Sequence, residues 1–81
     1  AGRSIDHKSA LQIWLHEMKQ PAPTYVLTGE HGPAHLKVFN VAVKIGDESI
    51  SRGEGRSKKV AEQQAAERAL GVIRERANRS Q

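Results

Sequence analysis

The stretch GEGRSKKV at residues 53–60, which continues into AEQQAA at 61–66, marks the passage from a glycine-rich loop into a helix. Its two glycines are expected to let the chain turn sharply, and Ser57 is the expected N-cap. Lys58 and Lys59 then fall in the first helical turn, where the partial positive charge of the helix N-terminus disfavours cations. Free backbone N–H groups and two ammonium groups in one place would attract an anion, and we expect that anion to be a phosphate.

The net charge of +4 is concentrated in the same part of the chain. Residues 1–51 hold five Lys/Arg and five Asp/Glu, which cancel, whereas residues 52–81 hold eight against four, a difference of +4. A basic patch on a small domain favours nucleic acid or an anionic membrane as the partner. The alternative is an ordinary solvated surface on which a few extra arginines give the same net charge.

The length of 81 residues allows one domain, which we place at residues 6–76, after a linker or cloning remnant at 1–5 and before a flexible tail at 77–81. The absence of cysteine excludes disulfides and thiolate zinc sites. No apolar run approaches the ~18 residues of a membrane span, and no signal-peptide pattern opens the chain, so we expect a cytoplasmic location.

Hydrophobic periodicity predicts an α+β fold of the order α-β-β-β-α, in which two helices pack on one face of a three-stranded antiparallel sheet. The expected helices cover residues 6–20 and 57–76, and the expected strands cover 24–28, 39–45 and 48–52, with a turn at 30–35.

Period-two alternation at residues 39–45 is the clearest strand signal. It predicts that Phe39, Val41, Val43 and Ile45 face the core while the residues between them face the opposite side. The aromatic residues Trp14, Tyr25 and Phe39 all fall on core-facing positions. We therefore interpret them as packing residues rather than as platforms on which single-stranded bases stack.

Taken together, these motifs resemble the double-stranded RNA-binding domain family. The resemblance covers about residues 7–75. It includes GPAH at 32–35 between the first two strands, Phe39 at the start of the second, and G-x-G-x-S-K-K-x-A at 53–61. KSALQ at 8–12, PAPTY at 21–25 and AEQ at 61–63 look most like the C-terminal RNA-binding domain of bacterial ribonuclease III. The acidic metal-binding motif ERLEFLGD of that family's nuclease domain does not occur here.

The resemblance implies three contacts with an A-form duplex, whose shallow minor groove displays 2′-hydroxyls. The first helix would place one row of exposed side chains, Ser9, Gln12 and His16, in the minor groove. Ile13, beside this row, replaces the family's usual glutamate. The loop at 32–35 would supply a second minor-groove contact. The start of the second helix would meet phosphates across the major groove. The residues expected to bind RNA are Ser9, Gln12, His16, Gly32, Pro33, His35, Arg56, Ser57, Lys58 and Lys59.

We expect no catalysis within this chain, no cofactor and no metal. The residues 53–58 lack the spacing of a P-loop, and the four histidines lack metal-like spacing. We expect the isolated module to be monomeric, and its parent to be a ribonuclease III-type protein that dimerises through another domain. The alternative is a module of the same fold that docks proteins or dimerises, for which an exposed Ile13 would be available.

Overall fold

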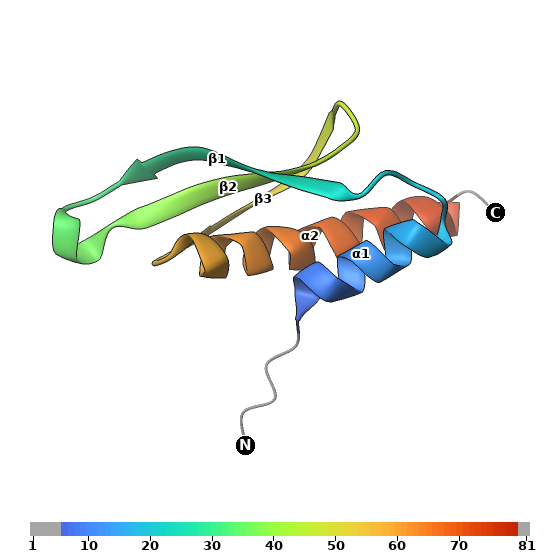
Figure 1. Cartoon of the computed structure of the whole chain (residues 1–81), viewed down its shortest axis with the longest axis horizontal. Coiled ribbons are helices and arrows are strands. Elements are labelled where there is room, and N and C mark those ends of the chain that lie inside the picture. Colours follow the sequence, from blue (N-terminus) through green and yellow to red (C-terminus); the bar gives the residue numbers. More distant parts are fainter. Residues whose placement is uncertain (1–5, 80–81) are drawn as a thin grey trace, which may run out of the picture.

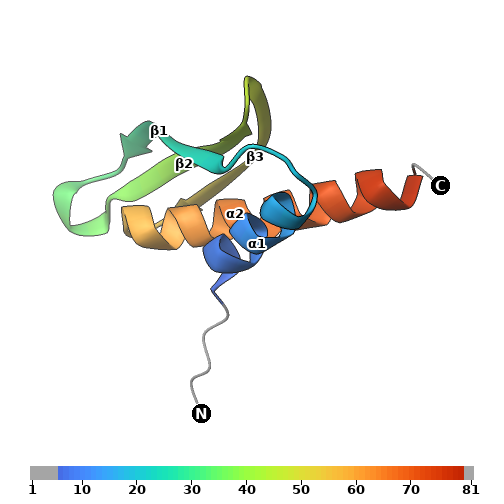
Figure 2. The same ribbon diagram turned by 45° about the vertical axis from the view of Figure 1, so that its right-hand side comes forward.

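The computed structural model describes residues 6–79, so the expected linker at 1–5 and residues 80–81 lie outside it. In chain order the elements are α1 (His7–Glu17), β1 (Pro23–His31), the 3₁₀ turn η1 (Ala34–Leu36), β2 (Val38–Ile45), β3 (Glu48–Gly55) and α2 (Lys58–Arg79). The strands form one antiparallel sheet in the order β1-β2-β3. Both helices lie on the same face of that sheet (Figures 1 and 2). The α-β-β-β-α order and the layer arrangement are therefore confirmed.

The core lies between the helices and β2. Leu11 and Leu15 of α1 and Val41 and Val43 of β2 are its largest buried side chains, and α2 adds the small residues Ala61, Ala65, Ala66 and Ala69 with Leu70. Phe39 and Ile45 are half-buried against this cluster, which confirms the predicted inner face of β2. Ala42 faces the other way but is also buried, between its strand neighbours Val26 and Arg52.

The three aromatic residues pack against the core as predicted. Lys8 Nζ lies 4.7 Å from the centre of the Tyr25 ring, and the Arg74 guanidinium lies 5.8 Å from the Trp14 ring. Burial is the main cause that raises the pKa of the Tyr25 hydroxyl to about 12. The three rings are partly buried against the core, as the packing role predicted for them requires.

The two glycines before α2 do not form the predicted loop. β3 continues through Gly53 to Gly55, and neither glycine has a positive φ. A Cβ on Gly53 would lie 2.4 Å from the carbonyl oxygen of Ala61, and one on Gly55 would lie 2.5 Å from Val60 Cγ1. These positions require glycine because α2 lies directly on the end of β3, rather than because the chain turns sharply there.

Side chains from α2 also cover the outer edge of β3. Gln64 Oε1 accepts a hydrogen bond from the amide of Glu54 at 2.8 Å, and Arg68 Nη1 donates one to the carbonyl of Arg52 at 2.9 Å. The Ser51 hydroxyl donates to the carbonyl of Ala65 at 2.6 Å. Backbone groups that a sheet edge would otherwise leave open are thus satisfied by the helix.

Helix α1 ends at Glu17, three residues before the predicted end. Lys19 has φ 58, the left-handed conformation usually taken by glycine. Its amide donates to the carbonyl of His16 at 3.1 Å, and the amide of Gln20 donates to that of Leu15 at 2.9 Å. This pair of bonds is a Schellman motif, so the chain leaves the helix before the prolines that were expected to end it.

Two other elements extend beyond their predicted bounds. β1 begins at Pro23 and runs to His31, so Glu30 and His31 lie in a strand rather than in the predicted turn, and an irregularity at Leu27/Gly29 interrupts its register with β2. α2 extends to Arg79, three residues beyond its expected end. The expectation of a flexible tail at 77–81 stays a prediction.

Candidate nucleic-acid interface

The predicted row of side chains on α1 lines a shallow groove. Ser9, Gln12 and His16 are all exposed and share this groove with Ile13, Glu17 and Gln20. Ile13 is 59% exposed, so its apolar side chain lies among polar ones. The helical spacing of i, i+3 and i+7 thus brings the three predicted residues together on one surface.

Ser9 also has a role within the protein. Its hydroxyl donates to Asp6 Oδ2 at 2.8 Å and its amide donates to Asp6 Oδ1 at 3.2 Å, so Asp6 is the N-cap of α1. Gln63 donates to the same carboxylate at 2.7 Å. This hydrogen bond from Gln63 and those from Ser9 lower the pKa of Asp6 to about 2. The Ser9 hydroxyl therefore has only its acceptor capacity left for a ligand.

The loop at 32–35 is shaped by its first two residues. Gly32 has φ 95, and a Cβ there would lie 2.8 Å from the carbonyl oxygen of Leu36, so the loop requires glycine at this position. The carbonyl of Pro33 accepts the amide of Leu36 at 2.8 Å and closes η1. His35 lies in this turn and is exposed, as a ligand-binding side chain must be.

The base of the loop is held by contacts of β1 with Lys37, which follows η1, and with Asn40 of β2. Lys37 Nζ lies 3.0 Å from Glu30 Oε1, and Asn40 Nδ2 lies 3.1 Å from His31 Nδ1. The His31 ring is thus engaged within the sheet, whereas the exposed His35 ring lies in the 3₁₀ turn.

The start of α2 has the predicted cap. Ser57 Oγ accepts a hydrogen bond from the amide of Val60 at 3.1 Å. Lys58 and Lys59 are exposed, and no acidic residue lies in the first turn. Within residues 6–79 neither lysine forms an ion pair, so both charges are directed to solvent together with the helix N-terminus.

Arg56 links the loop to α2. Its Nη2 donates a hydrogen bond to the backbone carbonyl of His35 at 3.2 Å, across a sequence separation of 21. Part of the predicted phosphate-contacting guanidinium therefore faces the protein. The sequence gives no local signal for this bond, because its partners are brought together only by the sheet.

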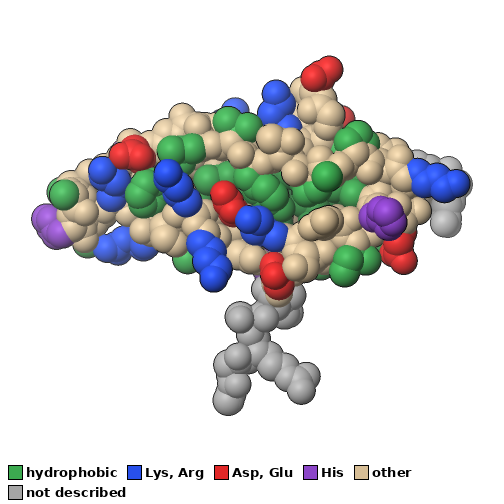
Figure 3. Space-filling model, in the orientation of Figure 1, with side chains coloured by type: hydrophobic (Ala, Val, Ile, Leu, Met, Phe, Trp, Pro, Cys, Tyr) green, Lys and Arg blue, Asp and Glu red, His purple; other side chains and the backbone are tan. Residues whose placement is uncertain are grey.

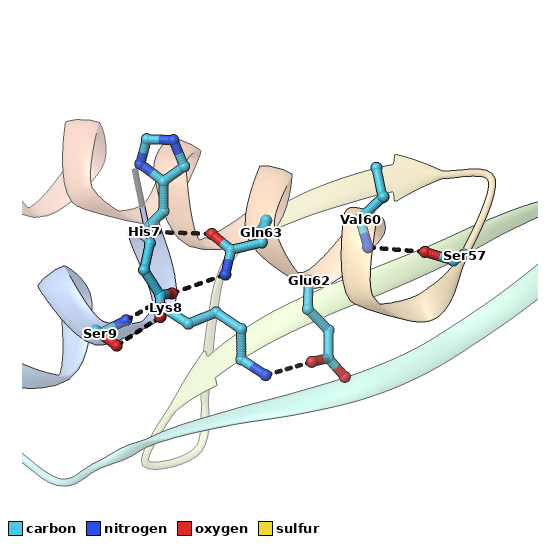
Figure 4. A network of polar contacts seen from close by, with 8 residues as sticks. His7, Lys8, Ser9, Ser57, Val60, Glu62 and Gln63 are labelled. Carbon is cyan, nitrogen blue, oxygen red and sulfur yellow. Dashed lines mark hydrogen bonds and ion pairs between the residues drawn. The ribbon is translucent and has the colours of Figure 1, made fainter. Parts of the chain in front are cut away.

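A network of polar contacts fixes the position of α1 on α2 (Figure 4). Gln63 Oε1 accepts the amide of His7 at 2.8 Å, while its amide nitrogen donates to the Asp6 cap. Lys8 and Glu62 form an ion pair beside it. Residues 6–8 and 62–63 were not predicted to interact, and their contacts hold the α1 groove at a defined position relative to the lysine pair.

The three segments lie along one face of the molecule. Figure 1 shows η1 and the first turn of α2 at the same end, with α1 running alongside α2 from its middle toward its C-terminal end. Lys and Arg side chains gather over the η1 end and the first half of α2 in the space-filling view (Figure 3). Residues 6–79 contain no group of three His, Cys, Asp or Glu residues placed to hold a metal ion. No helix in that part of the chain is long and apolar enough to cross a bilayer.

Comparison with known proteins agrees with this arrangement. The family model described as double-stranded RNA binding motif matches residues 7–73, which include α1, the loop and the start of α2. The chain belongs to this family. As a double-stranded RNA-binding domain it is a binding module, and the comparisons give no support to the protein-docking alternative.

The expected likeness of this RNA-binding domain to ribonuclease III is confirmed. It is 46% identical to Ribonuclease 3 of a Nitratiruptor species over 71 residues, which cover 88% of this chain and 31% of that protein. It is 44% identical to Ribonuclease 3 of Myxococcus xanthus, with coverages of 88% and 27%. The domain thus spans about 30% of the length of these curated relatives.

Solved structures share the fold of the RNA-binding domain. A structure of Arabidopsis HYL1, reported for its implications for miRNA processing, has a TM-score of 0.71 and 33% identity, and the match covers 84% of this chain and 96% of that one. A structure of Dicer from Pichia stipitis has a TM-score of 0.66 and 29% identity, with coverages of 82% and 32%.

Proposed function

We propose that this domain binds double-stranded RNA by shape, largely independently of sequence, through the three segments described above. Ser9, Gln12 and His16 of α1 enter one minor groove. Gly32, Pro33 and His35 enter the next minor groove, and Arg56, Ser57, Lys58 and Lys59 face the phosphates across the major groove between them. Such a division suits A-form RNA, because side chains cannot read its deep, narrow major groove.

The observation that carries the proposal is the charge at the start of α2. Lys58 and Lys59 are exposed and without ion pairs within residues 6–79, at a helix end where cations are disfavoured unless an anion neutralises them. A phosphate would accept hydrogen bonds from both ammonium groups and from the free N–H groups of the first turn. A surface helix without such a ligand usually carries acidic residues in its first turn instead.

The two minor-groove segments supply the preference for RNA over DNA. The exposed Gln12 amide and His35 ring can both donate and accept hydrogen bonds, and the 2′-hydroxyl that they would meet is absent from DNA. Pro33 limits the conformations of the free loop, so less entropy is lost when the loop binds.

We also propose that the chain is the RNA-binding module of a ribonuclease III-like protein of bacterial type. Phosphodiester cleavage would then belong to a separate domain with its own metal site, and dimerisation of the parent would occur through that domain. This module would be monomeric alone, would need no cofactor, and would act in the cytoplasm. The support for this proposal is the identity of 44–46% to proteins named Ribonuclease 3.

A comparison of three ligands tests the binding proposal. Fluorescence anisotropy would compare an RNA duplex of ~20 base pairs, long enough for the ~16 that such domains span, with a DNA duplex and single-stranded RNA of the same sequence. We expect tight binding to duplex RNA alone, and similar affinity for a second RNA duplex of different sequence. Equal affinity for duplex DNA would reject the minor-groove contacts, and preference for the single strand would reject the whole binding mode.

A further inference from the structure

Arg56 occupies a position that a phosphate contact alone does not explain. It lies between the end of β3 and the cap of α2, yet its guanidinium reaches sideways to the carbonyl of His35 in η1, 3.2 Å away. That carbonyl lies near the end of a 3₁₀ turn, where carbonyl groups lack amide partners within the turn itself. A hydrogen bond from a charged donor is stronger than one between neutral groups.

The loop is otherwise fixed only at its base. Lys37, directly after η1, pairs with Glu30 of β1, and the bond between Leu36 and Pro33 is internal to the turn. Among the hydrogen bonds found within residues 6–79, the Arg56 bond is the one that ties η1 to another part of the fold. Without this bond, η1 would be joined to the rest of the fold only through its base at β1 and β2.

We infer that Arg56 is a positioning residue, which holds the η1 loop at a set distance from the first turn of α2. The inference rests on the proposed function, because it matters only if His35 and the lysine pair contact one rigid duplex. An A-form helix offers a minor groove and the adjacent phosphates at a fixed spacing, so a loop already held at that spacing loses less entropy on binding.

A charge-matched pair of variants separates positioning from simple attraction. Arg56→Ala and Lys59→Ala each remove one exposed positive charge, so each lowers the slope of log affinity against log salt by about 0.9. Only Arg56→Ala should also lower the ratio of RNA to DNA affinity, by roughly threefold to tenfold, the value of one hydrogen bond. If both variants leave that ratio unchanged, Arg56 is a phosphate contact only and the inference is overturned.

A double-mutant cycle with His35→Ala gives a second measure of the same link. Arg56 acts through the loop, so Arg56→Ala should cause little further loss of RNA preference once the His35 ring is gone. Fully additive losses would contradict the inference.

Backbone dynamics of the free protein supply a measurement that does not depend on RNA. In Arg56→Ala we expect amide order parameters at residues 34–37 to fall from about 0.85 toward 0.6, the range of mobile loops, with no change in Lys59→Ala. Unchanged order parameters would overturn the positioning role even if RNA binds as proposed. Conversely, a loop that is rigid in the wild type and mobile in Arg56→Ala, in a domain with no preference for duplex RNA, would reject the proposed function and support the structural link made by Arg56.

Discussion

Gly53 of β3 and Ala65 of α2 are in backbone contact: a Cβ on Gly53 would lie 2.3 Å from the amide nitrogen of Ala65. No side-chain rotation can relieve so short a distance, because the obstructing atom belongs to the helix backbone. The close approach of β3 and α2 therefore depends on a hydrogen atom at one position and methyl groups at Ala61 and Ala65 on the facing helix.

Gly53→Ala should lower the free energy of unfolding by about 1–3 kcal/mol, the usual cost of forcing an extra carbon into a packed interface. Urea unfolding followed by circular dichroism measures this change. Gly71→Ala is the matched control, since nothing lies within 4 Å of its Cβ position on the exposed side of α2. That control should stabilise the protein by up to ~1 kcal/mol, as alanine does in a helix. A Gly53→Ala variant as stable as wild type would refute the close packing.

Lys19→Gly should stabilise the protein by about 1 kcal/mol, because Lys19 has φ 58 in the Schellman motif that ends α1, and a side chain is strained in that conformation whereas glycine is not. Lys19→Ala removes the same charge but keeps the Cβ, so it should bring no comparable gain. Thermal unfolding of the two variants decides between a backbone effect and a charge effect; equal shifts in Tm would exclude the former.

Asp6 should make stability depend on pH in the acid range. Its pKa is about 2 in the folded protein, chiefly because Gln63 donates a hydrogen bond to it, against an ordinary value of 3.8. A lowered folded pKa favours the native state when the carboxyl is ionised. The contribution is therefore complete above about pH 4 and disappears as the pH falls toward about 2.

Comparison with Asp6→Asn isolates this contribution. Glu48, whose pKa is also lowered by its hydrogen bond from Arg76, titrates in both proteins and cancels in the difference. The difference in unfolding free energy between wild type and Asp6→Asn should shrink as the pH falls from about 5 to about 2. A difference that stays constant over this range would show that the Gln63–Asp6 bond does not act through ionisation.

Lys58→Ala combined with Lys59→Ala should weaken binding to all duplex RNA sequences alike. The loss of two phosphate contacts should reduce the salt slope of log affinity by about 1.8. Lys44→Ala combined with Arg79→Ala removes the same charge from β2 and from the far end of α2, and should leave the slope nearly unchanged. Similar slopes for the two double variants would mean that net charge, rather than the start of α2, attracts the RNA.

Ile13→Glu should strengthen duplex RNA binding by roughly twofold to tenfold, because a carboxylate in the α1 groove can accept a hydrogen bond from a 2′-hydroxyl. Ile13 is 59% exposed beside Gln12 and His16, so the substitution does not disturb the core. Ile13→Ala is the control, since it removes the apolar surface without adding an acceptor. Weaker binding by Ile13→Glu alone would show that phosphate repulsion dominates at this position.

Elements with strong local patterns were predictable from the sequence, and contacts between distant elements were not. The inner face of β2 follows from strict alternation at 39–45, and the Ser57 cap follows from its place before a helical pattern. Gly53 and Gly55 carry the same local signal whether they form a loop or face a helix, so the end of β3 was misplaced. Only the packing of α2 on β3 shows that these glycines face a helix rather than form a loop.

The site was predictable to a similar extent. Periodicity placed Ser9, Gln12 and His16 on one surface, which the structure confirms. The bond between Arg56 and His35 spans 21 residues and the bond between Gln63 and Asp6 spans 57, so neither has a local sequence pattern. Lys19 in a left-handed conformation was missed because lysine seldom adopts it.

Gln64 and Arg68 of α2, which form hydrogen bonds with the edge of β3, affect how this domain behaves at high concentration. Another extended chain could lengthen the sheet there only by displacing Gln64 from the Glu54 amide and Arg68 from the Arg52 carbonyl. Each displacement exchanges a hydrogen bond already made for one of similar strength, so growth of the sheet across β3 brings little net gain. The helix whose first turn carries the exposed lysines thereby also limits aggregation through the β3 edge of the sheet.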